Sequence, residues 1–381
     1  MSIKPLRVGV VGSGLISGIY LKNMIGRFDI LEVAGLCSSH YENAKHRADE
    51  FGIPAYESLD AMLSDGSVDM IVNLTPAPAH EDIIRRALLA GKHVYTEKVM
   101  TTSHESARAL TDLAREKGLW LGSAPDTFLG AALQTARRAI DGGMIGEVTS
   151  FAFAANRDNS FLTSFFRFLN MPFGGVAYDY SVYYFTALCS LLGPVARVAA
   201  AVRAPYPTHR DVDPRSKTFG QDIATPNESE ISAVITLQSG VSGTAHVNAD
   251  SVIEDQHFFA IYGTKGVLYL PDPNGFGGEV RLQPNWAYDQ PPAPARVLAG
   301  DFGFSDNARG VGPAEMAWSI RMGRPARASA EMATHVLEVI DAIIESGRTN
   351  AFVDVASTFE RSATLAEPTD GEESSLGGVR S

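Results

Sequence analysis

The sequence predicts a two-domain protein, in which an α/β domain with a doubly wound parallel sheet is followed by an α+β domain with a large, mostly antiparallel open sheet. Three observations lead to this fold class. The 381 residues exceed what one compact core usually holds, at roughly 100–200 residues per domain. Apolar β-branched runs alternate with amphipathic stretches up to about residue 123. After about residue 124, strand patterns follow one another without intervening helices.

The first domain is expected over residues 1–124. Its predicted strands are Leu6–Val11, Leu31–Cys37, Met70–Leu74, His93–Thr96 and Leu119–Ser123. Amphipathic stretches between them predict helices around 17–27, 41–51, 78–90 and 103–117. Gly52, Gly91 and Gly118 each follow a helical run, where glycine readily takes the left-handed conformation that ends a helix.

The second domain is expected over residues 125–366. Its predicted elements are a helix near 128–141, a strand over Glu147–Asn156, a helix near 175–192, and strand stretches over Ile231–His246 and Phe258–Leu270. Two further helices, about 313–323 and 330–346, either cover this sheet or return toward the first domain. The tail over 367–381 is acidic and rich in small residues, so we expect it to be flexible.

Charge and cysteine usage exclude several classes of protein. The net charge is -12 and no cluster of Lys and Arg occurs, which argues against nucleic acid as a partner. Only Cys37 and Cys189 are present, so no disulfide framework is implied. No segment reaches the ~20 uninterrupted apolar residues of a membrane helix, and the chain starts without a secretory signal pattern. We therefore expect a cytoplasmic protein without a membrane partner.

A glycine-rich turn links the first strand to the first helix. Gly12 permits the tight turn, Gly14 lets the backbone approach a pyrophosphate, and Ser17 is small enough for close helix–sheet packing. With Leu15 and Ile16 this turn predicts a cofactor site in a Rossmann domain, where amides at the helix N-terminus bind the pyrophosphate. The alternative is an ordinary strand-to-helix turn, which the βα units that follow argue against.

The end of the second strand bears on the choice between NAD and NADP. NAD-binding domains usually carry an acidic residue there, which binds the ribose 2′-hydroxyl. This chain instead has Ser38, Ser39 and His40, which could donate hydrogen bonds to the 2′-phosphate of NADP. No arginine follows directly, so NAD and NADP both remain alternatives. Because the carboxylate is missing, our hypothesis slightly favours NADP.

Three further segments carry a family resemblance. They are Asn73–His80 (NLTPAPAH), Gly91–Lys98 (GKHVYTEK) and Gly174–Asp179 (GGVAYD). Together with the glycine turn, they resemble the Gfo/Idh/MocA oxidoreductases, a family named for glucose-fructose oxidoreductase and inositol dehydrogenase, over about residues 5–350. The resemblance implies an NAD(P)-dependent enzyme acting on a sugar or cyclitol carbon. It also implies an open sheet that lines the substrate site and often mediates assembly, so we expect a homodimer or homotetramer.

The resemblance also implies site residues in the first domain. Lys98 matches the lysine of a Glu-Lys-Pro motif and is expected to be the acid/base at the substrate hydroxyl, with its pKa lowered from about 10.4 by burial and nearby positive charge. Glu97 is expected to bind the cofactor ribose or orient the lysine. Val99 replaces the usual proline, so the resemblance does not define the backbone conformation at this position. Leu74, Thr75, Pro76 and His80 are expected beside the cofactor, with His80 near the nicotinamide.

In the second domain the family commonly has Asp and His four residues apart on one helical face. This chain has Asp179, expected to bind a substrate hydroxyl, and Tyr183, expected to assist as an acid/base or hydrogen-bond partner. The alternative for Tyr183 is an aromatic core stripe with Tyr180 and Tyr184. Further candidates for substrate binding are Arg157, Tyr178 and His246.

Three functions follow from these residues. The leading hypothesis is an NAD(P)-dependent dehydrogenase or reductase that moves a hydride between the nicotinamide and a carbinol carbon of a sugar, sugar derivative or cyclitol. A second is a redox-assisted lyase, glycosidase or epimerase with a tightly bound cofactor, which the tyrosine at position 183 keeps open. A third is a non-catalytic dinucleotide-binding regulator. No metal-ligand spacing occurs among the histidines and cysteines, so no metal is expected.

Overall fold

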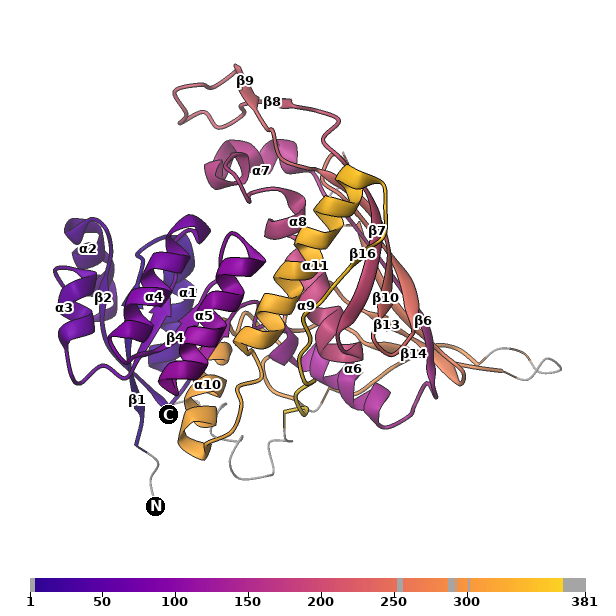
Figure 1. Ribbon diagram of the computed structural model, residues 1–381, viewed down its shortest axis with the longest axis horizontal. Coiled ribbons are helices and arrows are strands. Elements are labelled where there is room, and N and C mark those ends of the chain that lie inside the picture. The colour runs from indigo at the N-terminus through magenta and orange to yellow at the C-terminus, as the bar shows by residue number, and fades with distance from the viewer. Residues whose placement is uncertain (1–3, 252–255, 287–290, 292, 301, 366–381) are drawn as a thin grey trace. The chain divides into compact units, whose positions relative to one another are not determined.

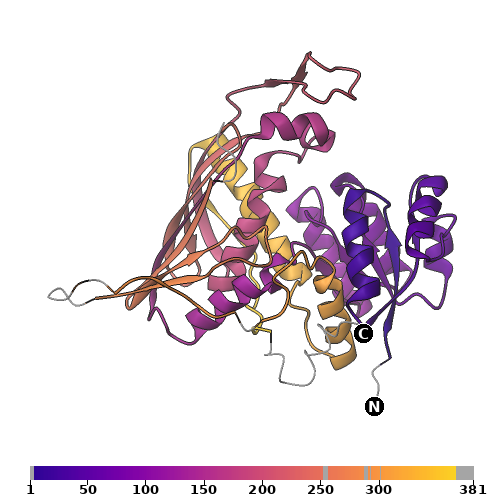
Figure 2. The same cartoon turned by 180° about the vertical axis from the view of Figure 1, so that it is seen from behind.

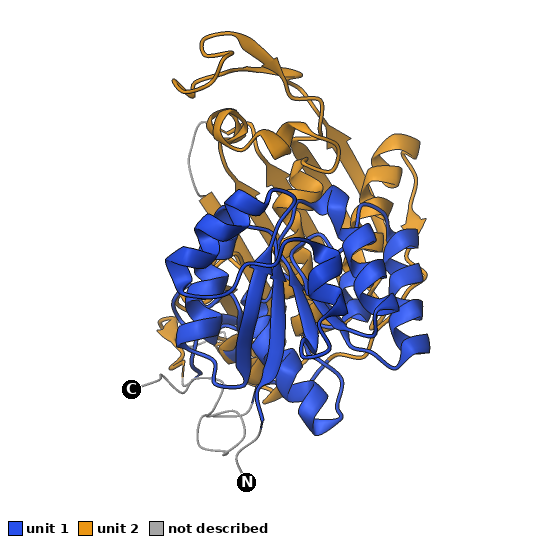
Figure 3. Cartoon of the chain, turned by 90° about the vertical axis from the view of Figure 1, so that its left-hand side faces the viewer, with its two compact units in different colours: residues 1–134, 301–334, 362–381 blue, residues 135–300, 335–361 orange. Residues whose placement is uncertain are grey.

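The computed structural model divides the chain into two compact units (Figure 3). The first comprises Met1–Gln134, Asp301–Thr334 and Ser362–Ser381, and the second comprises Thr135–Gly300 and His335–Arg361. The described residues are 4–251, 256–286, 291, 293–300 and 302–365, so the predicted tail over 367–381 lies outside them.

The first unit is built on a parallel sheet whose described strands stand in the order β2-β1-β3-β4-β5. Each neighbouring pair is parallel, and helices lie on both sides of the strands (Figure 3). This confirms the predicted doubly wound sheet. The strand order reverses between β1 and β3, and open α/β sheets bind ligands at the carboxyl ends of strands beside such a reversal. The strands are β1 Leu6–Val11, β2 Leu31–Cys37, β3 Met70–Asn73, β4 His93–Thr96 and β5 Leu121–Ser123.

The helices of this unit end largely where glycine predicts. The residues that end α2 and α5, Gly52 and Gly118, have φ of 64° and 65°, the left-handed conformation that glycine adopts without a steric penalty. Gly91, with φ of 75°, follows the C-cap of α4. The helices are α1 Leu15–Gly26, α2 Tyr41–Phe51, α3 Leu59–Ser64, α4 His80–Leu89, α5 His104–Lys117 and α10 Val311–Met322, with 3₁₀ turns η1 Ala77–Ala79 and η2 Thr127–Leu129.

The second unit is built on one large sheet. Its described strands stand in the order β15-β14-β13-β12-β6-β11-β10-β7-β16, and only the β6–β11 pair among them is parallel. This confirms the predicted, mostly antiparallel sheet. The strands are β6 Val148–Asn156, β7 Val195–Arg203, β10 Glu230–Leu237, β11 Ser242–Asn248, β12 Gln256–Gly263, β13 Gly266–Leu270, β14 Arg281–Pro284, β15 Arg296–Val297 and β16 Val353–Asp354, and a separate hairpin joins β8 Thr208–Arg210 to β9 Asp222–Ala224.

One face of this sheet is covered by helices and the other is open (Figures 1 and 2). Along β6, Phe151 and Phe153 are buried while Ala152 and Ala154 are only partly covered, because successive side chains point to opposite faces. The Phe153 ring packs against Phe185 of α9 at a centroid distance of 5.7 Å, so this is the face under the helices. The helices are α6 Ala131–Asp141, α7 Asn159–Phe165, α8 Val176–Asp179, α9 Ser181–Leu192 and α11 Ala330–Thr349, with the 3₁₀ turn η3 Arg167–Asn170.

Apolar length bears on membrane insertion. Among the described residues, no helix combines the length and the apolar character that crossing a bilayer requires.

Candidate active site

The glycine turn after β1 has the geometry that a pyrophosphate site needs. Gly12 has φ of 109°, and a Cβ there would lie 2.9 Å from the carbonyl of Leu74, so only glycine fits. α1 begins at Leu15 with Gly14 as its N-cap, and no described side chain caps it. A Cβ on Gly14 would meet no atom within 4 Å. The amide groups of the first helical turn are therefore open to an anion, as a dinucleotide requires.

Ser17 and Leu15 differ sharply in their surroundings. Ser17 is fully buried, and its hydroxyl donates to the carbonyl of Gly14 at 2.7 Å, which ties the turn to the helix. Leu15 is 83% exposed at the start of α1. The expected contact of Leu15 with a cofactor stays a prediction. Ile16, the next residue, is partly exposed.

The loop after β2 carries the three residues expected near the cofactor's adenosine ribose. Ser38 donates its hydroxyl to the carbonyl of His40 at 2.8 Å, which fixes the loop. Ser39 and His40 are exposed. No carboxylate occurs between Cys37 and His40, as the sequence indicated.

Thr75, Pro76 and His80 follow β3 at the same carboxyl edge of the sheet. His80 is fully buried, and its ring nitrogens lie 2.7 Å from the carbonyl oxygen of Thr75 and 2.8 Å from that of Val99. Burial lowers the pKa of His80, while these two hydrogen bonds act in the opposite direction. His80 therefore joins the loop after β3 to the residue that follows Lys98. Its expected contact with the nicotinamide stays a prediction.

Lys98 is held at the carboxyl end of β4 by its neighbours in the chain. The Glu97 carboxylate accepts hydrogen bonds from the Tyr20 hydroxyl of α1 at 2.8 Å and from the Lys98 amide at 2.9 Å. The peptide bond from Lys98 to Val99 is cis. Glu97 is 9% exposed, so its carboxylate is largely enclosed by these contacts. Both roles expected of Glu97, orienting the lysine and binding the cofactor ribose, stay predictions.

The buried carboxylate of Asp126 in this unit was not foreseen from sequence. Asp126 is 1% exposed and accepts hydrogen bonds from the backbone amides of Gly310 and Gly312. Burial raises the pKa of Asp126 to about 6, although the two amides oppose the shift. Burial also raises the pKa of Tyr20 well above its ordinary value, and the nearby Glu97 charge adds to this effect. Glu97, Tyr20 and Asp126 are therefore all buried polar groups of this unit.

In the second unit, α8 carries Asp179 and is fixed from two directions. Its first turn is anchored by Glu228, whose backbone carbonyl accepts from the Val176 amide and whose carboxylate accepts from the Ala177 amide at 3.1 Å. Tyr178 donates its hydroxyl to Asp341 of α11 at 2.7 Å. Substrate binding by Tyr178 stays a prediction, while its observed contact is an anchor for α8.

Asp179 and Tyr183 flank the junction of α8 and α9. Asp179 is the only partly exposed residue in 174–180, where its neighbours are buried. Tyr183 is 9% exposed on α9. The next residue, Tyr184, packs against Phe153 at 5.2 Å and belongs to the core. The roles of Asp179 and Tyr183 toward a substrate stay predictions.

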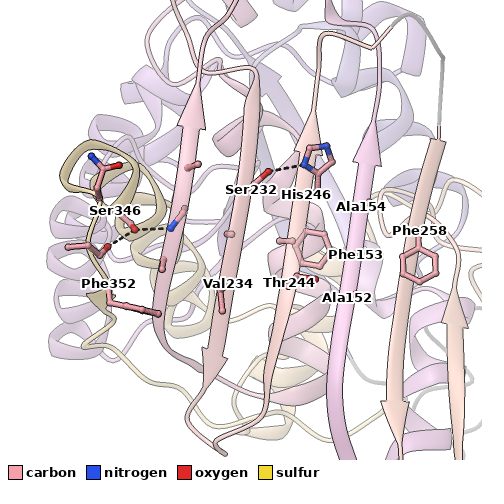
Figure 4. A pocket seen from close by; sticks show the side chains of 17 residues that line it. Ala152, Phe153, Ala154, Ser232, Val234, Thr244, His246, Phe258, Ser346 and Phe352 are labelled. Atoms are coloured by element: carbon pink, nitrogen blue, oxygen red, sulfur yellow. Dashed lines mark hydrogen bonds between the residues drawn. The ribbon is translucent and has the colours of Figure 1, made fainter.

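Arg157 and His246 lie on opposite faces of the large sheet. The Arg157 guanidinium stacks over the Tyr180 ring, 4.4 Å from its centroid, on the helix-covered face. His246 instead lies on the open face, where its ring bonds to the Ser232 hydroxyl at 3.0 Å and lines a hollow of about 770 Å³ (Figure 4). The structure thus brings Arg157 to the segment that follows Asp179 and does not bring His246 there.

Comparison with known proteins places the chain in a family. Residues 6–124 match the oxidoreductase family with an NAD-binding Rossmann fold, and residues 133–269 match the GFO/IDH/MocA C-terminal domain. The chain belongs to the GFO/IDH/MocA family of NAD(P)-dependent oxidoreductases, which confirms the resemblance carried by its motifs.

Individual relatives are distant, and the two that are named for a sugar are named for different sugars. The chain is 29% identical to dTDP-3,4-didehydro-2,6-dideoxy-alpha-D-glucose 3-reductase of Streptomyces violaceoruber over 78% of this chain and 85% of that one. It is 27% identical to D-xylose 1-dehydrogenase (NADP(+)) 2 of Haloferax volcanii over 91% and 99%. A match to an uncharacterized oxidoreductase of Schizosaccharomyces pombe, at 28% identity, spans about half of each chain, 52% and 55%.

Among solved structures, levoglucosan dehydrogenase in complex with NADH is similar in fold. The TM-score is 0.80 with 19% sequence identity, covering 93% of this chain and 100% of that chain. This likeness shows a shared fold.

Proposed function

We propose that this protein transfers a hydride between NAD(P) and a carbinol carbon of a sugar, sugar derivative or cyclitol, with Lys98 as the acid/base. The observation that carries the proposal is the fixed position of Lys98. Glu97 before it is bonded to α1, Val99 after it is bonded to His80, and the glycine turn opens at the same carboxyl edge of the sheet. When bound, the cofactor supplies the hydride donor or acceptor.

Five residues have distinct roles in the proposed reaction. The Lys98 amine takes the proton from the substrate hydroxyl during oxidation and returns it during reduction. Asp179 accepts a hydrogen bond from a substrate hydroxyl and so orients the sugar. Tyr183 donates a hydrogen bond near the reacting oxygen. Glu97 and His80 hold the Lys98 backbone in place.

The test is the Lys98→Met variant, which keeps the length of the side chain and removes its amine. We expect kcat to fall by about 10²- to 10⁴-fold, the usual contribution of a positioned acid/base, with cofactor affinity unchanged. Lys45→Met is the control, because Lys45 is an exposed residue of α2 paired with Asp49. A Lys98→Met enzyme that keeps the wild-type rate would remove Lys98 from the mechanism.

We further propose that NADP is the preferred cofactor. The loop after β2 has no carboxylate to repel a 2′-phosphate, and Ser39 and His40 are exposed there as donors. The Arg47 guanidinium lies 3.7 Å from where a Cβ of Gly18 on α1 would stand, and the Glu50 carboxylate pairs with it at 2.6 Å. Initial rates with NAD and NADP at matched concentrations decide between the two.

The open face of the large sheet is the surface that we propose for self-association into a dimer or tetramer. Val234 and Phe258 are 46% and 41% exposed on it, and alanines of β6 lie between them (Figure 4). An exposed apolar sheet face of this kind is typical of an interface.

The two cysteines are buried free thiols, which fits the reducing cytoplasm expected from sequence.

A further inference from the structure

Arg157 is a partly buried cation that forms no ion pair with another of the described residues. Its guanidinium contacts the face of Tyr180, and no carboxylate of the described residues lies within ion-pair distance of it. Other arginines of the same unit do have such partners. They include Arg137 with Asp141, Arg167 with Asp211, Arg203 with Glu230 and Arg210 with Asp222.

The position of Arg157 is well defined. Its amide donates to the carbonyl of Asn248 at 2.9 Å, and its carbonyl accepts from the Ser251 amide at 3.1 Å. The Tyr180 ring beneath the guanidinium is 6% exposed and packs edge-on against Tyr184 at 5.7 Å. A stacked guanidinium on a fixed backbone loses little further freedom when it binds a ligand.

The N–H groups of this guanidinium are accessible to a ligand, because Arg157 is only partly buried. Partial burial removes water from a charged group, and the cost is recovered only when hydrogen-bond partners replace that water. Its planar fork matches the two oxygens of a carboxylate or phosphate.

We propose that Arg157 binds an anionic group of the substrate, so that the enzyme acts on an acidic sugar, either a sugar carboxylate or a sugar phosphate. The inference rests on the proposed function, in which Asp179, the residue before Tyr180, binds a substrate hydroxyl. The Arg157 guanidinium, which lies over Tyr180, then binds the charged substituent of the same substrate molecule. This assigns a specificity-determining role to Arg157 and narrows the substrate class.

The experiment compares D-gluconate, D-glucuronate and D-glucose 6-phosphate with neutral D-glucose, using wild type, Arg157→Ala and Arg157→Lys. We expect wild type to favour one anionic sugar, and Arg157→Ala to raise its KM by about 10- to 100-fold with KM for glucose within about twofold. Arg157→Lys, which keeps the charge without the planar fork, is expected to lie between the two. Whether the carboxylates or the phosphate respond identifies the anion.

Arg281→Ala is the matched control, because Arg281 of β14 also faces an aromatic ring, Tyr269 at 5.9 Å. It is expected to leave every KM unchanged. An equal rise in KM for neutral and anionic sugars in Arg157→Ala would show that Arg157 only supports Tyr180, and would overturn the inference. A wild type that prefers glucose would overturn it as well.

Binding measurements separate this inference from the proposed function. Isothermal titration calorimetry with the same four sugars needs no turnover, so it tests Arg157 even if none of them is oxidised or reduced. Tighter binding of an anionic sugar that disappears in Arg157→Ala supports the inference. Absence of NAD(P)-linked turnover with a broad sugar panel would instead count against the proposed function.

Discussion

Gly174 and Gly175, which precede α8, are close to different kinds of neighbours. A Cβ on Gly175 would lie 2.1 Å from a carboxylate oxygen of Glu228, the group that accepts from the Ala177 amide. A Cβ on Gly174 would lie 2.3 Å from the backbone carbonyl oxygen of Phe168. The neighbour of Gly175 is thus the end of a side chain, whereas the neighbour of Gly174 is backbone.

These contacts set the expected cost of each substitution. Gly175→Ala forces the Glu228 carboxylate away from the Ala177 amide, and a hydrogen bond to a charged group contributes about 1.5–3 kcal/mol. Glu228→Ala loses the same bond, so each single variant should lower the free energy of unfolding by about 2 kcal/mol. In the double variant the alanine at 175 meets no carboxylate, so the pair should cost about 2 kcal/mol rather than about 4.

The assay is equilibrium unfolding in urea, followed by circular dichroism, with kcat/KM measured in parallel because α8 carries Asp179. Gly174→Ala should also destabilise, by about 1–3 kcal/mol from overpacking, and Glu228→Ala should not relieve it. Gly26→Ala serves as a neutral control, since a Cβ there meets nothing within 4 Å. Additive costs for Gly175→Ala and Glu228→Ala would refute the account of how α8 is held.

Three further predictions concern the cofactor, pH and assembly. Ser39→Asp introduces a carboxylate after β2 and should lower kcat/KM for NADP relative to NAD by about tenfold or more, which corresponds to about 1.4 kcal/mol. An unchanged ratio of the initial rates with the two cofactors would contradict the proposed NADP site. Burial lowers the pKa of His335 to about 4, and its neutral ring accepts from the Val195 amide at 2.9 Å. The stabilisation is therefore complete above the unfolded pKa of about 6.5 and is lost as pH falls toward 4, on the order of 3 kcal/mol. The free energy of unfolding of His335→Gln should therefore fall by about 3 kcal/mol less than that of wild type between pH 6.5 and pH 4, and parallel curves would contradict this. The two proteins are compared as a difference because Asp126, with its raised pKa of about 6, titrates in the same pH range with the opposite effect on stability. Val234→Glu should shift the molar mass measured by light scattering toward the monomer, and an unchanged mass would exclude this face as the interface.

The strands of the first unit could be predicted from sequence because their signals are local. Leu31–Cys37 and His93–Thr96 were expected with the bounds that the structure shows, since buried parallel strands are continuous apolar runs between clear turns. α3, Leu59–Ser64, was missed because six residues are too few to establish a helical period. The strand Val195–Arg203 was missed because a run of alanines interrupts its alternation.

The site residues divide in the same way. Gly12, Lys98 and Asp179 belong to short motifs and were named from sequence. Tyr20, which bonds to Glu97, is separated from it by 77 residues. Glu228 is 51 residues from the Ala177 amide that it holds. No local pattern connects such pairs, because the fold brings them together.

His246 and Arg157 show that strand alternation alone does not predict on which face of the sheet a side chain lies. Both lie on or beside strands, and no local pattern assigns them to different faces of the sheet. The register pairs His246 with Ser232 and Ala154, which belong to the open face, whereas Arg157 is directed to Tyr180. Only the packing of α9 against Phe153 decides which face is the inner one.

The most direct measurement of the central claim is isotope transfer from a sugar deuterated at the reacting carbon. The account predicts that deuterium appears at C4 of the released nicotinamide, in step with oxidised sugar, and that Lys98→Met slows its appearance by orders of magnitude. Turnover of the sugar that leaves the released cofactor without deuterium would contradict the account.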